Sequence, residues 1–379
     1  MRRSRRRGGA GFVAWVFVAK SGSAFTIGLA FLAYIGSADA HFAERTRSIA
    51  GYVSRSEIVV AGVIDEWSEQ LKAGHSERNG FGLLRVEETL KGEVPAGTSL
   101  RFEASGIHQP TYPPDEHVLL FLNRIPDSNP PHYLTMQNSL ERIGLGSDSA
   151  ATILGAVREY VAIEQIHEPG VKLERLKTAT LRFLASSLPI LWQNALLDLS
   201  TRSDLPLDSS DVAILRGLTM DETRPGILRV GCVAKLKAMG STRNRLALKA
   251  MEDVVSSNAA PFVRALAATA LQEIGAPSSL PTLVAALQDS SPAVREAAAN
   301  GLGRLRRSDA IPPLARTARS DSNRLVRFSA LKAIARIGGA VAEQALAELR
   351  KHSGDPKVSQ QIDLARREIE QQSPVKEAR

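Results

Sequence analysis

The chain has 379 residues, a length that can bury a stacked core large enough to stabilise it. Its single cysteine excludes an intrachain disulfide. The formal net charge is +8 at pH 7, but the first 40 residues hold six basic residues and one acidic residue, which leaves 42 basic and 39 acidic residues and a net charge of +3. Global charge therefore gives no ground for expecting a nucleic-acid-binding protein.

Residues 1–40 have the three parts of a secretory signal peptide. Five arginines lie within residues 2–7, an apolar core follows at residues 25–36, and small residues occupy the −3 and −1 positions of a cleavage site after Ala40. The core is short for a transmembrane span, and Lys20 interrupts the longer apolar stretch before it. We predict cleavage and export to the periplasm or the extracellular space, with an uncleaved membrane anchor as the alternative.

Residues 41–148 are predicted to form a small β domain. Short segments rich in β-branched residues and bounded by Gly, Pro, Asn and Asp predict five strands, at residues 56–67, 81–92, 98–106, 117–125 and 132–137. This number of strands suggests a small antiparallel barrel or sandwich. The segments SEIVVAGVI, LLRVEETLKGEVPAGTSLRF and DEHVLLFL are distantly similar to the netrin or tissue-inhibitor-like form of the oligonucleotide/oligosaccharide-binding barrel. The cysteines of that module are absent, so no inhibitor residues carry over.

Linker helices are expected at residues 149–185. The segment SAATILGAVREYVAIEQI reads as a helix from residue 149 to residue 166, and Glu168, Pro169 and Gly170 interrupt it.

Three similar phrases follow, beginning at Val263, Val294 and Val326: VRALAATALQEIG, VREAAANGLGRLR and VRFSALKAIARIG. They start 31 and 32 residues apart, and fainter copies begin at Leu228 and Leu191. Such a period indicates stacked helical repeats, because one helical hairpin cannot bury its own apolar face. Apolar residues recur at helical spacing within each phrase, and alanines fall at equivalent positions where helices pack closely.

A second helix is predicted before each phrase, at residues 278–288 and 309–320, since Ser or Asp followed by Pro begins a helix. An Asp or Asn also stands six residues before each phrase arginine. We predict that it caps the following helix and that the arginine bridges to the Asp or Asn of a neighbouring repeat. This structural ladder comprises Asn258, Arg264, Asp289, Arg295, Asp321 and Arg327. A ligand-binding row of arginines is the alternative.

These phrases resemble HEAT repeats, in particular the short, alanine-rich HEAT-like repeats also found in bilin lyases. The resemblance covers about residues 186–352 and implies a right-handed superhelix of antiparallel helix pairs, which usually binds proteins. The segment after it departs from the pattern, because Ser359 stands where an arginine is expected. Its apolar residues form one stripe, which predicts a terminal capping helix. The solenoid is thus expected at residues 186–372, with a disordered tail at residues 373–379.

Motifs of known chemistry are absent from the sequence: it has no phosphate-binding glycine loop, no HExxH, no CxxC and no Gly-x-Ser-x-Gly elbow. The single cluster of metal-ligand types surrounds a proline-rich loop and comprises His108, Asp115, Glu116, His117 and His132. Two imidazoles and a carboxylate can hold zinc, but this spacing fits no named motif. We expect solvated loop residues here, no cofactor, and a buried Cys232 that acts as a small apolar residue.

One repeat is strongly basic. Between residues 303 and 336 nine basic residues face two acidic ones, a net charge of +7. Arg327 is assigned to the ladder. The other eight form either a solvated face or a docking surface for an anionic partner: Arg304, Arg306, Arg307, Arg316, Arg319, Arg324, Lys332 and Arg336.

The leading hypothesis is an exported, non-enzymatic scaffold in which a β-barrel head precedes a HEAT-like solenoid that binds a protein partner. One rival is a metal-dependent enzyme or metal-binding module at the loop around His108 and His117. The other is an envelope-associated structural protein whose basic repeat binds anionic polymer or lipid. A nucleic-acid partner is not expected, and membrane contact is expected only through an uncleaved signal or the basic repeat.

Overall fold

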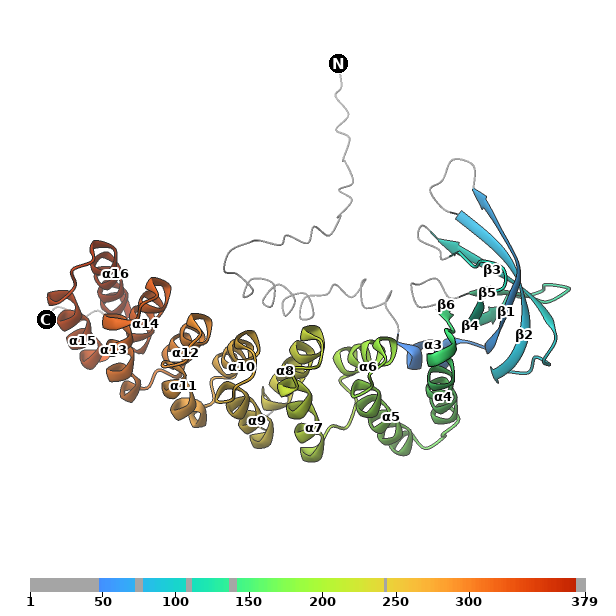
Figure 1. Ribbon diagram of the computed structural model, residues 1–379. Coiled ribbons are helices and arrows are strands. Elements are labelled where there is room, and N and C mark those ends of the chain that lie inside the picture. The colour runs from blue at the N-terminus through green and yellow to red at the C-terminus, as the bar shows by residue number, and fades with distance from the viewer. Residues whose placement is uncertain (1–47, 72–77, 107–110, 136–141, 242–243, 373–379) are drawn as a thin grey trace, which may run out of the picture.

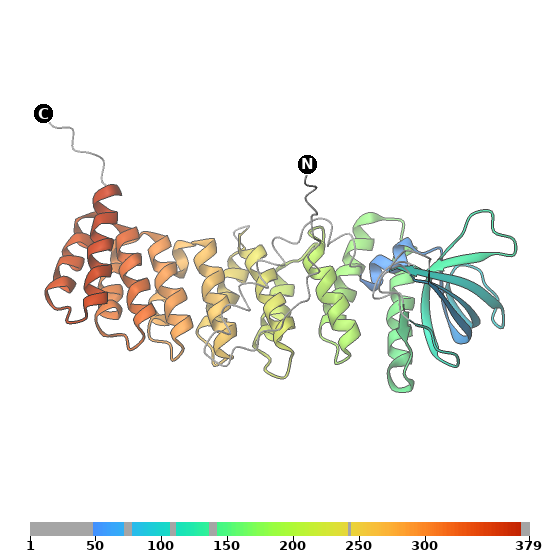
Figure 2. The same ribbon diagram turned by 90° about the horizontal axis from the view of Figure 1, so that it is seen from above.

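The computed structural model describes residues 48–71, 78–106, 111–135, 142–241 and 244–372. A β barrel lies at one end of a row of paired helices, and the row ends at α16 (Figures 1 and 2). The predicted fold class, a small β barrel followed by an all-α solenoid, is confirmed. The predicted signal peptide and His108 lie outside the described residues, and no helix within them combines the length and apolar character needed to cross a bilayer.

The barrel is a closed circuit of five strands in the order β1, β2, β3, β5, β4 and back to β1. Every pairing in the circuit is antiparallel except the parallel one between β3 and β5, and a sixth strand pairs with β4. The five predicted strands are present, whereas the sixth was not predicted because three residues are too few to show a period. The strands are β1 (Ile58–Leu71), β2 (Arg78–Lys91), β3 (Ser99–Gly106), β4 (His117–Arg124), β5 (His132–Thr135) and β6 (Arg142–Gly144).

Strand β4 joins the barrel to the helices because both of its faces are buried. Val118, Leu120 and Leu122 belong to the barrel interior, while Leu119 and Phe121 belong to the core of the solenoid. This explains why β4 reads as a continuous apolar run rather than an alternating one.

The solenoid consists of helices in two rows: α6, α8, α10, α12 and α14 follow one side in Figure 1, and α5, α7, α9, α11 and α13 the other. Their core is continuous from α3, which precedes β1, to α16. The helices are α3 (Ile49–Arg55), α4 (Ser147–Glu164), α5 (Pro169–Leu184), α6 (Pro189–Thr201), α7 (Ser209–Met220), α8 (Gly226–Ser241), α9 (Arg245–Val255), α10 (Pro261–Ile274), α11 (Leu280–Ala286), α12 (Pro292–Leu305), α13 (Ile311–Ser320), α14 (Arg324–Ile337), α15 (Gly339–Lys351) and α16 (Pro356–Gln372).

The repeat register explains the packing. Each phrase forms the second helix of its pair (α10, α12 and α14), and its first valine is fully buried. The large apolar residue eight positions later is also fully buried in all three helices: Leu271, Leu302 and Ile334. In α16 the predicted stripe of Val358, Ile362, Ala365 and Ile369 is buried as well.

Helix ends follow the local sequence. Proline opens α10 and α12, and Asn323 caps α14 by accepting the N–H of Leu325 at 2.8 Å. Gly275 ends α10 with a φ of +67°, a conformation that glycine adopts without strain. At the same turn after α12 stands Arg306, with a φ of +51°. An arginine in this conformation is uncommon, so Arg306, near the start of the basic repeat, departs from the repeat pattern.

Candidate protein-binding surface

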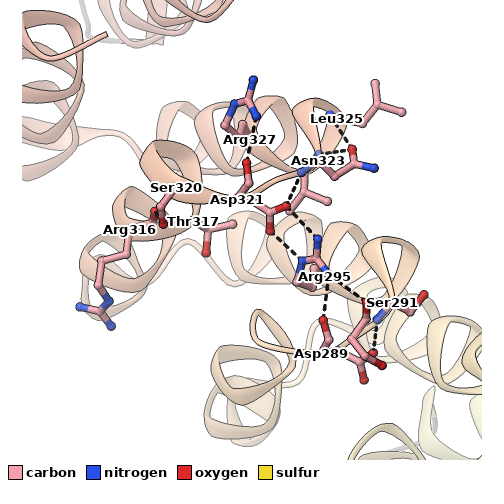
Figure 3. A network of polar contacts seen from close by, with 12 residues as sticks. Asp289, Ser291, Arg295, Arg316, Thr317, Ser320, Asp321, Asn323, Leu325 and Arg327 are labelled. Atoms are coloured by element: carbon pink, nitrogen blue, oxygen red, sulfur yellow. Dashed lines mark hydrogen bonds and ion pairs between the residues drawn. The ribbon is translucent and has the colours of Figure 1, made fainter. Parts of the chain in front are cut away.

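The arginines of the phrases lie in a row along the edge where each first helix turns into the second. Arg264 donates two hydrogen bonds to the carboxylate of Asp289, from Nε at 2.9 Å and from Nη2 at 2.8 Å. Arg295 binds Asp321 in the same way, at 2.7 Å and 2.8 Å (Figure 3). Each arginine thus reaches forward to the carboxylate of the next repeat. We call one such Arg–Asp pair a rung.

The remaining guanidinium nitrogen of each arginine donates a hydrogen bond to a backbone carbonyl in the loop that precedes its own helix. Nη1 of Arg295 donates to the carbonyl of Asp289 at 2.9 Å, and Nη1 of Arg327 donates to the carbonyl of Asp321 at 2.9 Å. One rung therefore ties two helices and two loops together. The geometry is bidentate and charge-assisted, the strong form of this interaction.

Each carboxylate also accepts the N–H of the N-cap residue of the following helix, without being the cap itself, since α12 has no side-chain cap and Asn323 caps α14. Asp289 accepts the N–H of Ser291 at 2.7 Å, and Asp321 accepts the N–H of Asn323 at 2.8 Å. Burial by itself raises the pKa of Asp289, but the hydrogen bonds from Arg264 and Ser291 outweigh it, and the pKa of this carboxyl is lowered. The pKa of Asp321 is lowered for the same reasons, with Arg295 and Asn323 as the donors.

The ladder differs from the sequence prediction at both ends. At its C-terminal end Arg327 binds Asp355 at 3.2 Å. The sequence did not predict this rung, because Asp355 stands three residues before Val358, whereas the other aspartates stand five residues before the valine of their phrase. At its N-terminal end Asn258 is exposed, and among the described residues no arginine bonds to it. In that loop Ser257 Oγ accepts the N–H of Ala259 instead.

The basic repeat is not one patch. Arg304 and Arg336 occupy the last turns of α12 and α14, with Arg306 just after α12. We call these three the end group. Arg316 and Arg319 lie in the second half of α13, and Arg324 begins α14. We call these the start group.

The two groups lie at opposite ends of α14. Twelve residues separate Arg324 from Arg336, which is about 18 Å along a helix and about twice the screening length at physiological salt. The six side chains are exposed, as is Lys332 midway along α14. None of these seven has an ion pair within the described part of the chain. Arg307, by contrast, pairs with Asp309 at 2.7 Å.

The loop with the predicted metal-ligand types shows no metal geometry within the described residues. His117 Nδ1 lies 3.4 Å from Glu87 Oε2, and both side chains are about half exposed. No group of three or more His, Cys, Asp and Glu that could hold a metal occurs among the residues described, and His108 lies outside them. Cys232 is buried, and burial raises the pKa of its thiol to about 12.

Sequence reasoning missed a buried polar cluster where the barrel joins the solenoid. Ser48, the cap of α3, donates to Asp198 of α6 at 2.5 Å, and the N–H of Ile49 donates to Asn194 at 2.9 Å. Burial raises the pKa of Asp198 to about 6, although the Ser48 hydrogen bond and the charge of Arg202 oppose the shift. The partners are some 150 residues apart, so no local pattern could have revealed the cluster.

A pocket on the barrel was missed for the same reason. It has a volume of about 510 Å³, and its lining includes Trp67, Phe81, Arg101, Glu103 and His132. These residues come from four strands, and His132 Nε2 is buried without a hydrogen-bond partner among the described residues.

Two family models match the solenoid. Residues 280–365 match HEAT repeats, and residues 263–289 match the PBS lyase HEAT-like repeat. The solenoid is therefore a helical repeat scaffold of the HEAT type. No curated protein matches the chain.

Solved structures share the helical architecture at low identity. One, from a study of microtubule plus-end tracking by XMAP215, CLIP-170 and EB1, is 16% identical with a TM-score of 0.39, and the match covers 50% of this chain and 89% of that one. An engineered protein is 17% identical with a TM-score of 0.35, covering 52% and 96%. The CpcE–CpcF complex of phycocyanin lyase from Nostoc is 21% identical with a TM-score of 0.33, covering 49% and 74%. At such identities the likeness is one of fold alone.

Proposed function

We propose that this chain is an exported, non-enzymatic scaffold that binds an acidic protein partner through the last repeats of its solenoid. The observation that carries the proposal is the set of seven exposed cations on α12, α13 and α14 that have no ion pair within the described residues. They project from helices whose apolar faces are already used in stacking.

The ladder favours a binding role for these cations because it holds the helices that carry them. Arg295 and Asp321 join the loops before α12 and α14, and their side chains are only 11% and 6% exposed. The helices that carry the end group and the start group are therefore held in place relative to one another. Fixed charges lose little conformational freedom when a partner binds, which favours affinity.

Because about 18 Å separates the two groups, a partner that engages both must present two acidic clusters at that spacing. A single acidic segment would engage one group only. The two cases predict different behaviour when the groups are reversed in charge one at a time.

The test uses the mature chain from residue 41 as bait for capture from the envelope fraction. One variant carries Arg304→Glu, Arg306→Glu and Arg336→Glu, and a second carries Arg316→Glu, Arg319→Glu and Arg324→Glu. The matched control carries Arg55→Glu, Arg175→Glu and Arg245→Glu, exposed residues of α3, α5 and α9, with the same change in net charge. We expect at least one of the first two variants to lose the captured protein at low salt and the control to retain it. Equal capture by all variants would contradict the proposal, and retention of the mature protein on anionic vesicles without any captured protein would favour the envelope-binding alternative.

Export rests on the N-terminal sequence. N-terminal sequencing of the protein recovered from cells is expected to give His41, Phe42 and Ala43. Recovery of residues before Ala40 in the membrane fraction would favour the anchored alternative.

A further inference from the structure

The two ends of the molecule carry opposite charge. Residues 56–145, which include the barrel, hold 13 acidic and 7 basic residues, a net charge of −6. Residues 303–336, the basic repeat, have a net charge of +7 and lie toward the other end of the row of helices (Figures 1 and 2). The barrel of one molecule and the basic repeat of another are therefore electrostatically complementary.

On the barrel, carboxylates gather beside the pocket of about 510 Å³. Asp65, Glu66 and Glu103 line this pocket. The carbonyl of Ile64 accepts the N–H of Asp115 at 2.8 Å, which brings Asp115 close to Asp65. Glu66, Glu103 and Asp115 form no ion pair within the described part of the chain. No group of three or more such residues there could hold a metal ion, so these carboxylates are spread over a surface and can meet several cations.

An exposed aromatic ring lies among these carboxylates. Phe81 is 36% exposed and lies directly opposite Glu103 of β3. Residues that lie opposite each other in antiparallel strands point to the same face of a sheet. Two positions along, Leu83 lies opposite both Arg101 of β3 and Glu66 of β1, so these three residues share that face with Phe81 and Glu103. We call the five residues the pocket face, which presents an exposed ring, two carboxylates and one cation.

The start group has the complementary composition. Arg324 begins α14, and Leu325, which follows it, is 61% exposed. The other two arginines of the group lie at the end of α13, across the short loop that joins the two helices. Beside the end group, by contrast, Leu305 and Ile337 are partly buried against the core. Only the start group therefore combines free cations with an exposed apolar neighbour in the basic repeat, as the pocket face combines carboxylates with an exposed ring.

We propose that the pocket face of the barrel binds the start group of a second copy of this chain. The inference rests on the proposed function and deepens it, since it identifies the acidic partner of the last repeats as the barrel of another copy. Phe81 of one copy packs against Leu325 of the other, while Glu66 and Glu103 face the arginines of the start group. An apolar contact surrounded by charged pairs is the usual arrangement of a protein interface.

Two antiparallel copies make this contact twice. The barrel and the start group lie toward opposite ends of an elongated molecule, so a two-fold axis between the copies places each barrel on the other's last repeats (Figures 1 and 2). Once the first contact has formed, the second is made within the same complex at a high effective concentration. Two modest contacts therefore suffice for a closed dimer.

The test exchanges the charges of the two surfaces in the mature chain from residue 41. The barrel variant carries Glu66→Arg and Glu103→Arg, and the start variant carries Arg319→Glu and Arg324→Glu. Molecular mass is measured by analytical ultracentrifugation at about 0.05 M and about 0.5 M salt. Each variant alone is expected to raise the dimer dissociation constant at least about tenfold at low salt, because repulsion replaces attraction in both contacts.

Mixing the two variants is the decisive measurement. In the mixed dimer one contact is that of the wild type and the other has both signs reversed, so dimer formation should return to within about threefold of the wild-type constant. This recovery also shows that both variants are folded. The matched control, Arg304→Glu with Arg336→Glu, has the same change in net charge as the start variant and should dimerise like the wild type. Leu325→Ser should weaken the dimer without changing its salt dependence.

Two results would overturn the inference: wild type that stays monomeric up to about 0.1 mM, or a mixture that forms no more dimer than either variant alone. A mass that grows beyond two copies with concentration would overturn the two-fold arrangement. Failure here is distinct from failure of the proposed function. Monomeric wild type that still captures another protein from the envelope fraction, and loses it on charge reversal of the end or start group, would retain the scaffold and reject self-association.

Discussion

Replacement of Asp321 by Asn tests whether the rungs hold the solenoid together. The substitution keeps the size of the side chain, and its amide oxygen can still accept the N–H of Asn323. It removes the charge that Arg295 binds through two hydrogen bonds, at 2.7 Å and 2.8 Å. At most one hydrogen bond from the guanidinium to an uncharged oxygen can replace them, because the amide nitrogen cannot accept.

The expected loss follows from this geometry. A hydrogen bond to a charged group contributes about 1.5–3 kcal/mol, and the substitution removes at least one of the two. Removing one partner of a buried pair outright costs about 3–5 kcal/mol. Since Arg295 retains the carbonyls of Asp289 and Ser290, we expect Asp321→Asn to lower the free energy of unfolding by about 2–4 kcal/mol.

The assay is urea unfolding followed by far-ultraviolet circular dichroism, with hydrogen exchange to locate the effect in α12 and α14. Asp309→Asn is the matched control, because the Arg307–Asp309 pair has similar distances but is about half exposed. It should cost about 0–1 kcal/mol. Equal losses in the two variants would refute the view that burial makes the rungs stabilising. Recovery of stability in a double variant, Arg295→Met with Asp321→Leu, would support it, since no unpaired charge then remains buried.

Three further predictions follow from the packing and the pKa shifts. Leu302→Ala should lower the free energy of unfolding by about 2–5 kcal/mol, because Leu302 is fully buried, while exposed Arg304→Ala should cost under about 0.5 kcal/mol; equal effects in urea unfolding would refute the register. The pKa values of Asp289 and Asp321 are lowered in the folded state, so the stability that they contribute is fully present at neutral pH and is lost as pH falls below the ordinary aspartate value of 3.8. Asp321→Asn should therefore flatten the acid limb of an unfolding titration. Asp198 should give the opposite pH dependence, because its pKa of about 6 lies above 3.8 and the folded state therefore binds the proton more tightly. The free energy of unfolding should fall as pH rises from about 4 to about 6, and Asp198→Asn should remove that slope.

The repeats could be predicted because the pattern that determines the packing of each repeat lies within about 30 residues. The valine, alanine and leucine positions recur at one spacing, so a helix period and a repeat period fix which residues are buried. The ladder was partly predictable for the same reason. The direction of the rungs could not be predicted, because an arginine flanked by two similar repeats can reach the aspartate of either one. Nor could the sequence show that Asn258, at the position equivalent to Asp289, makes no contact with an arginine of the described residues.

The barrel was harder to predict than the solenoid because its contacts are non-local. Strands β3 and β5 pair in parallel across about 30 residues, and β4 packs on helices that follow it. The cluster of Ser48, Asn194 and Asp198 joins segments about 150 residues apart. Short-range patterns give the existence of such strands but not their partners. The division of the basic repeat into an end group and a start group could not be predicted from its net charge, because residues close in sequence lie at opposite ends of one helix.

The joint between α8 and α10 should open more easily than the joints that follow it. In a repeat protein each unit is stabilised mainly by the interfaces with its neighbours. The joints that follow α10 and α12 are each closed by a bidentate rung. The joint between α8 and α10 has the Arg229–Phe262 contact instead, and Nη2 of Arg229 has no hydrogen-bond partner among the described residues. Opening should therefore be easiest at α8 and α10, and hydrogen exchange should be fastest there among the central helices. Equal exchange in α8, α10, α12 and α14 would contradict this reasoning.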